Sequence, residues 1–519
     1  MKVNQIKLGA ILSYAIIFLS NIVNLLFTPF MLRCLGKSEY GLYALIGSFV
    51  GYIVVLDFGL GNTIIRFVAK YRAEKDQKGQ ENFLAICMLI YSVISILVLL
   101  IGIILYFKLQ AIFGDSLTVM EMGKAKVMFL ILISNLALSL PLNSFSAIMS
   151  GHEQFVLPRI LTLIRIILRT GILFILLSSG YKAITIVMLD TVLNVCMMLI
   201  TMFYVFVKMK VRIRLHYFEK VLLQEVFGYS FFVFLNMVVD QVYWRLGQVI
   251  LGITAGTAAV AVFAVGIQFP QYYMQFSTAI SGLFLPRVTQ LVIHKVSGEQ
   301  MTDLFIKAGR IQFIILGYIL LAFILFGKQF ILLWAGPDYG LAWVISVLIM
   351  IPLTVPLFQN VGISILQAKG MHAFRSLMSV VIAVCNILIS LVLLKEYGTV
   401  GVALGTAVAL VVGNIVAINL YYYFKVGLNI PRFFKEVNVG LLPIMFIAAG
   451  VGTLTLLVQG HSWLVLLVQG VLFTLIYYVL IWYFGMNEYE KNLILTPLKG
   501  IVKQLRNKKL NDGVTCFFF

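Results

Sequence analysis

The chain has 519 residues, of which 61% are hydrophobic and 11% are charged, and its mean hydropathy is +1.03. Soluble domains carry about 25% charged residues, so this composition excludes a set of soluble domains and indicates an integral membrane protein. The net charge of +19 does not indicate nucleic-acid binding. Its lysines and arginines gather in alternate loops between apolar segments, which is a signal of membrane topology.

Long apolar segments follow one another along the whole chain. A helix needs about 20 apolar residues to cross the hydrocarbon core, and on this criterion the sequence predicts an all-α fold with about fourteen transmembrane helices. The predicted spans are 8–33, 40–65, 83–107, 126–150, 158–178, 183–207, 227–253, 258–285, 309–327, 342–367, 377–394, 400–424, 438–459 and 462–485. The first has no small-residue cleavage site, so we expect a retained helix and not a signal peptide.

The distribution of basic residues predicts the orientation. Most Lys and Arg residues fall in loops on the side of the two termini, for example Arg66, Lys70 and Arg72 after the second span. By the positive-inside rule both termini are therefore expected in the cytoplasm. Two amphipathic segments, 216–223 and 493–510, are expected to lie on the cytoplasmic membrane surface with their lysines toward anionic headgroups.

An internal repeat relates the first six predicted helices to the second six. The segment 151–155 (Gly-His-Glu-Gln-Phe) matches 370–374 (Gly-Met-His-Ala-Phe), and Leu35-Gly36 matches Leu251-Gly252. This predicts two pseudo-repeated six-helix lobes around a central cavity, plus two extra C-terminal helices. The expected organisation is an N-terminal lobe (1–207), a cytoplasmic connector with an interfacial helix (208–226), a C-terminal lobe (227–424), helices 13 and 14 (425–485) and a basic cytoplasmic tail (486–519).

Three arginines at membrane depth are candidate substrate-binding residues. Charges there cost roughly 2.5–3.5 kcal/mol each on insertion scales, so they usually face a cavity or a partner. Arg165 and Arg169 are spaced i,i+4 and share one helix face, and Arg245 lies in the seventh span. Guanidinium groups stay charged and offer a bidentate fork, which suits a pyrophosphate or a carboxylate.

Three aspartates also lie within predicted spans. Asp57, Asp190 and Asp240 are candidate coupling or counter-ion groups. Three arginines and three aspartates sum to zero, so pairing that only holds the helices together explains the same residues. Both interpretations stay open.

Amide side chains add a candidate polar lining. Asn21 and Asn24 lie in the first span, and Gln268 and Gln271 lie in the eighth, around Pro270, which is expected to kink that helix. They are candidate contacts to sugar hydroxyl groups, and interhelical hydrogen bonding explains them equally well.

The sequence contains no motif that indicates an enzyme. Gly36-Lys37-Ser38 lacks the earlier glycine of a phosphate-binding loop, because Met31 stands at that position. The five cysteines show no C-x-x-C spacing, so neither a metal site nor a disulfide framework is predicted. The loops are too short for a nucleotide-binding or catalytic domain. We therefore expect a protein that is not an enzyme and needs no cofactor.

The second span and its basic end carry a resemblance to a known family. Residues 35–76 read LGKSEYGLYALIGSFVGYIVVLDFGLGNTIIRFVAKYRAEKD. This stretch resembles the polysaccharide-export flippases of O-antigen and capsule type, which belong to the multidrug/oligosaccharidyl-lipid/polysaccharide exporter superfamily. Span count, repeat and loop pattern extend the resemblance over the whole chain.

The resemblance implies a function. It implies alternating-access transfer of an undecaprenyl-pyrophosphate-linked oligosaccharide from the cytoplasmic to the outer leaflet of a bacterial plasma membrane (the inner membrane). It also implies a cationic cavity, for which Arg165, Arg169 and Arg245 are the matching residues. Expected partners are the lipid-linked oligosaccharide, the membrane, and a polymerase or other glycan-assembly proteins, with no nucleic acid.

Two other functions remain open from the sequence. A proton- or sodium-coupled multidrug antiporter would need unpaired carboxylates in its cavity, and the paired arginines count against it. A non-transporting membrane scaffold of a glycan-assembly complex would tolerate loss of Arg165 and Arg169 while failing on changes to loops or tail.

Overall fold

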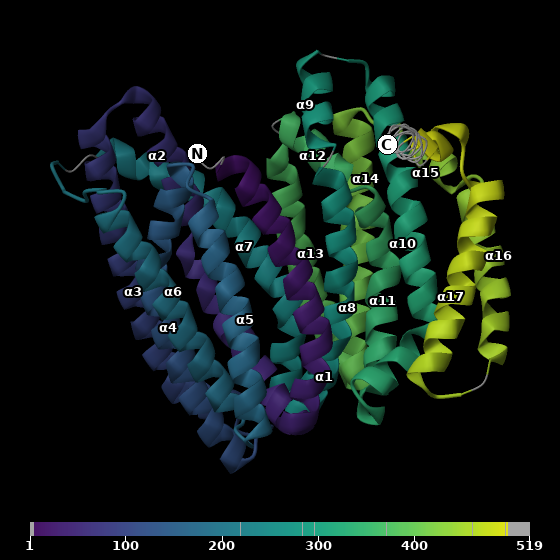
Figure 1. Cartoon of the computed structure of the whole chain (residues 1–519), viewed down its shortest axis with the longest axis horizontal. Coiled ribbons are helices and arrows are strands. Elements are labelled where there is room, and N and C mark those ends of the chain that lie inside the picture. Colours follow the sequence, from purple (N-terminus) through teal and green to yellow (C-terminus); the bar gives the residue numbers. More distant parts are fainter. Residues whose placement is uncertain are drawn as a thin grey trace, which may run out of the picture. The chain divides into compact units, whose positions relative to one another are not determined.

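A computed structural model of the chain describes residues 5–217, 220–282, 284–294, 296–369, 371–458, 460–493 and 495–496. The described residues form helices joined by short turns, and no strand occurs among them (Figure 1). This confirms the predicted all-α fold. Ten helical segments in the described part are long and apolar enough to cross a membrane.

Seventeen α-helices follow one another along the described chain. They are α1 (Gln5–Ile53), α2 (Leu60–Glu74), α3 (Gln77–Phe113), α4 (Val119–Gly151), α5 (Val156–Ser178), α6 (Ala183–Val207), α7 (Lys220–Thr254), α8 (Gly256–Gly282), α9 (Leu285–Ile293), α10 (Gly298–Trp334), α11 (Gly340–Phe358), α12 (Val361–Ala368), α13 (His372–Leu410), α14 (Ile418–Tyr421), α15 (Ile430–Asn438), α16 (Leu441–Gly452) and α17 (Trp463–Leu480). Short 3₁₀ and π turns extend several of them.

Every predicted span overlaps one or more of these helices. Two of the ten membrane-length segments, Lys7–Glu74 and Leu377–Val426, each contain two predicted spans. The predicted spans 227–253 and 258–285 fall on α7 and α8. The exact number of crossings stays a prediction. Of the two amphipathic segments, 216–223 overlaps the start of α7, and 493–510 lies almost wholly outside the described residues.

The predicted span 40–65 is not one continuous helix. The second part of α1 ends at Ile53 and passes into a 3₁₀ turn, Val54–Asp57. Phe58 (φ 52°) and Gly59 (φ 67°) then adopt left-handed conformations, and the Phe58 N–H donates to the Val55 carbonyl at 3.1 Å. The chain therefore breaks beside Asp57 before α2 begins. Hydropathy does not reveal this break, because the residues around it are apolar.

Two backbone features recur along the described chain. Helices α3 and α10 each have 37 residues. Gly36 bends α1 with φ of 75°, and Gly256 separates α7 from α8 with φ of 77°. Only glycine adopts this conformation without steric cost. Gly256, and not the Gly252 of the sequence match, is the glycine with a positive φ near this position, and the repeat itself stays a prediction.

The helices pack into two compact units. Unit 1 contains Met1–Tyr272, Trp334–Ile349 and Ala373–Gly413, and unit 2 contains Tyr273–Leu333, Met350–His372 and Asn414–Phe519. These units are defined by which helices pack together. The predicted lobe boundaries at 207 and 227 stay a prediction. The predicted extra pair, α16 and α17, belongs to unit 2.

A buried arginine fastens this extra pair within unit 2. Arg310 of α10 is 8% exposed. Its Nε donates to Glu490 Oε1 at 2.5 Å, and its Nη2 donates to the Gly485 carbonyl at 2.9 Å. Its Nη1 donates to the carbonyls of Glu436 and Val439. Because all of these groups lie at the ends of α15, α16 and the turn after α17, one guanidinium ties them to α10.

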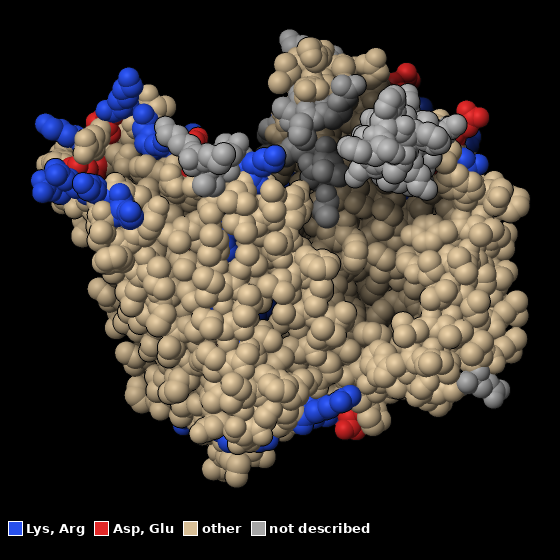
Figure 2. Space-filling view, viewed as in Figure 1, with Lys and Arg blue, Asp and Glu red and all other residues tan. Residues whose placement is uncertain are grey.

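In unit 1, an apolar cluster holds α5 and α6 against the first part of α1. Its buried members are Phe27, Met31, Leu35, Leu173, Leu177 and Ile186. Exposed basic residues gather at the end of unit 1 that carries α2 and the start of α3, as Figure 2 shows at the upper left. They include Arg66, Lys70, Arg72, Lys75 and Lys78. Helix α1 begins at the same end.

Candidate functional site

The first element of the site is an ion pair between α5 and α6. Arg169 Nε donates to Asp190 Oδ1 at 2.5 Å, and Arg169 Nη2 donates to Asp190 Oδ2 at 3.0 Å. Their side chains are 23% and 21% exposed. This is the bidentate geometry that gives an arginine–carboxylate pair both strength and a fixed orientation. The sequence analysis selected both residues without assigning them to each other.

Arg165 lies one turn earlier on α5 and has a different partner. Its Nη1 donates to Asn194 Oδ1 of α6 at 3.1 Å. Asn194 is held in turn from α4, because its Nδ2 donates to Asn135 Oδ1 at 3.1 Å and to Ser139 Oγ at 3.0 Å. Among the described residues, Arg165 forms no ion pair with a carboxylate. The two arginines therefore do not form a symmetric clamp.

Arg245 of α7 lies against a glycine face of α1. Its Nη1 donates to the Gly47 carbonyl at 3.5 Å. A Cβ added to Gly51 would lie 2.6 Å from Arg245 Cδ and 2.8 Å from Nε, so the side chain occupies the space that this glycine leaves. Within the described part of the chain, no carboxylate is paired with Arg245. The side chain of Asp240 lies outside that part.

Tyr43 connects these groups. It lies one turn before Gly47 on the same face of α1, and its hydroxyl group lies close to the Arg169 guanidinium. Asp190 and Arg245 are both close enough to interact with it electrostatically. Tyr43 thus lies between the ion pair and Arg245. Sequence reasoning missed it; the only signal was the i, i+4, i+8 spacing of Tyr43, Gly47 and Gly51 on one helix face.

The amides selected from the sequence are only partly brought together. Gln268 of α8 donates to Tyr272 OH at 2.6 Å and to Thr28 Oγ1 of α1 at 3.4 Å. Gln271 and Asn21 are half-buried, whereas Asn24 is exposed. Gln268 therefore links α8 to α1, with tyrosine beside it.

Asp57 has other neighbours. It lies beside the Tyr91 hydroxyl group and the Gly59 N–H, at the break between α1 and α2. In the described structure, Asp57 forms no ion pair with an arginine. Of the three selected aspartates, only Asp190 is placed beside the arginines in the described structure.

Comparison with known proteins identifies the family. The model of the family described as "Polysaccharide biosynthesis protein" matches residues 7–293, more than half of the chain. The chain belongs to this family. All of the site residues on α1, α5, α6, α7 and α8 lie within the matched range.

Individual relatives agree with this assignment. The chain is 22% identical over 495 residues to the uncharacterized membrane protein EpsK of Bacillus subtilis, covering 92% of this chain and 95% of that protein. Among solved structures, the inward closed conformation of the lipid II flippase MurJ matches with a TM-score of 0.70 at 17% identity, covering 91% of this chain and 97% of MurJ. An inward-facing multidrug resistance MATE family transporter of the MOP superfamily matches with a TM-score of 0.60 at 16% identity, covering 80% and 95%. The chain therefore has the fold of this superfamily.

Proposed function

We propose that the protein moves an undecaprenyl-pyrophosphate-linked oligosaccharide from the cytoplasmic to the outer leaflet of a bacterial plasma membrane, by alternating access and for cell-surface polysaccharide synthesis. Membership of the polysaccharide biosynthesis family and a fold shared with a lipid II flippase support this proposal. One observation carries it. Arg165 and Arg245 are cations within apolar helices, and in the described structure neither is paired with a carboxylate.

The charges of the site suit a pyrophosphate. Arg169 and Asp190 neutralise each other, and among the described side chains this leaves the two positive charges of Arg165 and Arg245 for a ligand. A diphosphate diester carries two negative charges and many acceptor oxygens, and guanidinium groups bind such oxygens in pairs. Among the described residues, Arg245 makes only a long contact to a carbonyl, so we propose that most of its five N–H donors are available to a phosphate.

Tyrosine and amide groups near the arginines suit the sugars. Tyr40 and Tyr43 have ring centroids 6.4 Å apart on α1. Tyr40 also interacts electrostatically with Tyr272, the hydrogen-bond partner of Gln268. Amphipathic aromatic rings and amides supply both the flat surface and the hydrogen bonds that a sugar requires. Gln271, Asn21 and Asn24 are proposed as further contacts.

We propose that the membrane potential drives the transfer. Moving one elementary charge is worth about 2.3 kcal/mol per 100 mV, so a headgroup with two negative charges gains roughly twice that on leaving a negative interior. The pairing of Asp190 with Arg169 and of Asp57 with Tyr91 gives both aspartates structural partners. An organic-cation antiporter would place free carboxylates at this point instead.

A depletion experiment tests the proposed function. Depleting the protein in its native host should cause the undecaprenyl-pyrophosphate oligosaccharide to accumulate in extracted lipids, and wild type should relieve this. The Arg165→Ala/Arg245→Ala variant should not relieve it at equal membrane levels. Arg159→Ala, which removes an exposed arginine from the same α5 helix, is the matched control and should complement. If the lipid-linked oligosaccharide does not accumulate on depletion and the cells become sensitive to cationic compounds, the flippase proposal is wrong and the antiporter becomes the favoured function.

A pair of glycine variants tests the placement of Arg245 without changing any charge. Gly51→Ala places a methyl group where the Arg245 side chain lies, so the guanidinium must move and complementation should fall at least severalfold. Gly47→Ala meets nothing within 4 Å and should complement like wild type. Alanine is a better helix former than glycine, so a loss in Gly51→Ala at normal protein level reports the position of Arg245. Equal complementation by the two variants would contradict the assignment.

A further inference from the structure

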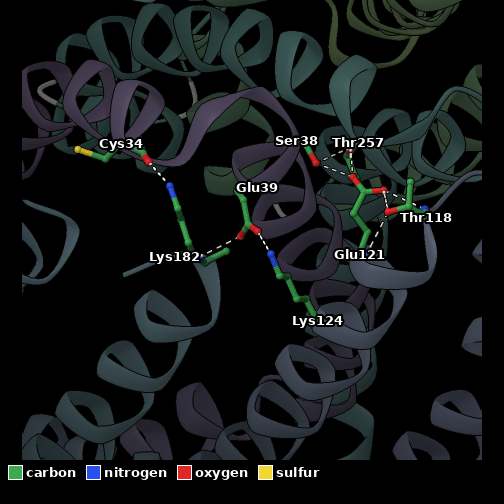
Figure 3. Close-up of polar contacts among 9 residues, drawn as sticks. Cys34, Ser38, Glu39, Thr118, Glu121, Lys124, Lys182 and Thr257 are labelled. Carbon is green, nitrogen blue, oxygen red and sulfur yellow. Dashed lines mark hydrogen bonds and ion pairs between the residues drawn. The ribbon is translucent and has the colours of Figure 1, made fainter. Parts of the chain in front are cut away.

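A polar cluster closes the end of unit 1 opposite the start of α1. Figure 1 shows α1 running from its start to a bend at the other end of unit 1, and this bend falls at Gly36. Beside this bend lie the first turn of α4 and the junction of α7 and α8 at Gly256. Figure 3 shows the carboxylate of Glu121, from α4, facing Ser38 of α1 and Thr257 of α8.

Glu121 joins three elements at once. Its Oε1 accepts from Ser38 Oγ at 2.5 Å and from Thr257 Oγ1 at 2.7 Å. Its Oε2 accepts from the N–H of Thr118 at 2.9 Å and from the Thr118 hydroxyl at 2.8 Å, which completes a capping box and fixes the carboxylate at the start of α4. Hydrogen bonds to an ionised carboxylate are stronger than those between neutral groups.

A second contact joins the first six predicted helices to the α7–α8 junction. Ser116 Oγ donates to the Gly252 carbonyl of α7 at 2.5 Å. A Cβ on Gly41 would overlap the Thr257 carbonyl, so the backbones of α1 and α8 touch here. Both contacts tie elements of the first six predicted helices to the α7–α8 junction, which belongs to the second six.

Neighbouring contacts in Figure 3 are of a different kind. Glu39 forms an ion pair with Lys124, and Lys182 Nζ donates to the Cys34 carbonyl at 2.7 Å. These groups come from α1, α4 and the start of α6, so the contacts hold the first-half helices to one another. Breaking the Glu39–Lys124 pair is therefore a suitable control for breaking the contacts of Glu121.

Farther along α1 and α7, buried polar atoms have no hydrogen-bond partner in the described structure. They are Ser48 Oγ and Tyr52 OH on α1, and Gln241 Oε1 and Tyr243 OH on α7. Buried polar groups are rarely left unpaired, because each costs about 1–3 kcal/mol. If the seam between α1 and α7 opens in another conformation, water supplies the missing hydrogen bonds to those of these groups that line it.

We propose that Glu121, Ser38 and Thr257 form the latch of an outer gate. When the latch breaks, the part of α1 after Gly36 separates from the α7–α8 junction, and the seam that leads to Tyr43 and Arg245 opens to the outside. The carboxylate holds the gate closed because it bonds one hydroxyl from each side. The outward direction rests on the orientation in the proposed function.

Thiol accessibility tests the gate without any substrate. In a chain whose five native cysteines are replaced, Ser48→Cys places a thiol in the seam, where Ser48 is 1% exposed. A membrane-impermeant maleimide applied to intact cells should label it several times faster when Glu121→Ala is added. Lys124→Ala, which breaks the contact within the first half, should leave the rate unchanged. Equal rates for all three proteins would overturn the proposal.

A disulfide cross-link across the latch should lock the gate closed. Ser38 Oγ and Thr257 Oγ1 are 3.5 Å apart, so Ser38→Cys/Thr257→Cys should oxidise to a disulfide with a small shift. Oxidation should protect the Ser48→Cys thiol and stop complementation, and a reductant should restore both. Failure to cross-link, or labelling that oxidation does not slow, contradicts the latch. If labelling follows these expectations but no lipid-linked oligosaccharide accumulates on depletion, the gate stands and the proposed substrate is wrong.

Discussion

Arg245→Ala should lower transport of the lipid-linked oligosaccharide at least tenfold while the protein remains folded and at its normal membrane level. The reason is the environment of this side chain. Within the described structure, Arg245 donates a hydrogen bond to the Gly47 carbonyl and is paired with no carboxylate. Removing it therefore leaves no described carboxylate without its counter-ion. A charge-assisted pair of hydrogen bonds to phosphate is lost, at about 1.5–3 kcal/mol per bond.

The measurement is complementation of the depleted strain, with the lipid-linked intermediate quantified against protein level. Arg245→Lys is the informative companion, because lysine keeps the charge and loses the planar fork. It should restore part of the activity. Transport by Arg245→Ala at the wild-type rate would remove this residue from the site.

Arg169 and Asp190 should behave in the opposite way. Breaking a buried ion pair by removing one partner costs about 3–5 kcal/mol, because the other charge stays buried and uncompensated. Arg169→Ala and Asp190→Ala should therefore each reduce the amount of folded protein and its melting temperature in detergent. The double variant Arg169→Leu/Asp190→Leu removes both charges, and apolar pairs of similar volume often replace buried ion pairs without loss of stability. It should recover most of the melting temperature.

The comparison of single and double variants separates two roles. Recovery of stability in the double variant would show that each charge compensates the cost of burying the other, as the bidentate geometry of the pair indicates. A double variant as unstable as the sum of the singles would mean that the two side chains act independently, and would contradict the pairing.

The elements of the fold could be predicted because the bilayer imposes helices of known length. Each predicted span overlaps one or more helices for that reason. The break beside Asp57 could not be predicted, since it depends on left-handed conformations at Phe58 and Gly59 within an apolar segment. Likewise, the glycine at the second bend is Gly256, which a match of two-residue strings does not locate.

The site was predictable in its residue types and not in its pairing. Arg165 and Arg169 share a helix face, and that much follows from their spacing. Their different partners, Asn194 and Asp190, depend on how α6 is set against α5, which local sequence does not specify. Tyr43 and Gly51 carry no signal of their own within an apolar helix. They gain their roles only when α7 brings Arg245 against α1.

Purified protein in sealed liposomes provides the most direct test of the central claim. A labelled undecaprenyl-pyrophosphate oligosaccharide is placed in one leaflet, a membrane potential is applied, and its arrival in the other leaflet is followed with an impermeant enzyme or reagent. Wild type and Arg159→Ala should transfer it much faster than protein-free liposomes, and the rate should rise with the potential. Arg165→Ala/Arg245→Ala should be as slow as liposomes without protein. Transfer by this double variant at the wild-type rate, or no transfer by wild type, would contradict the account.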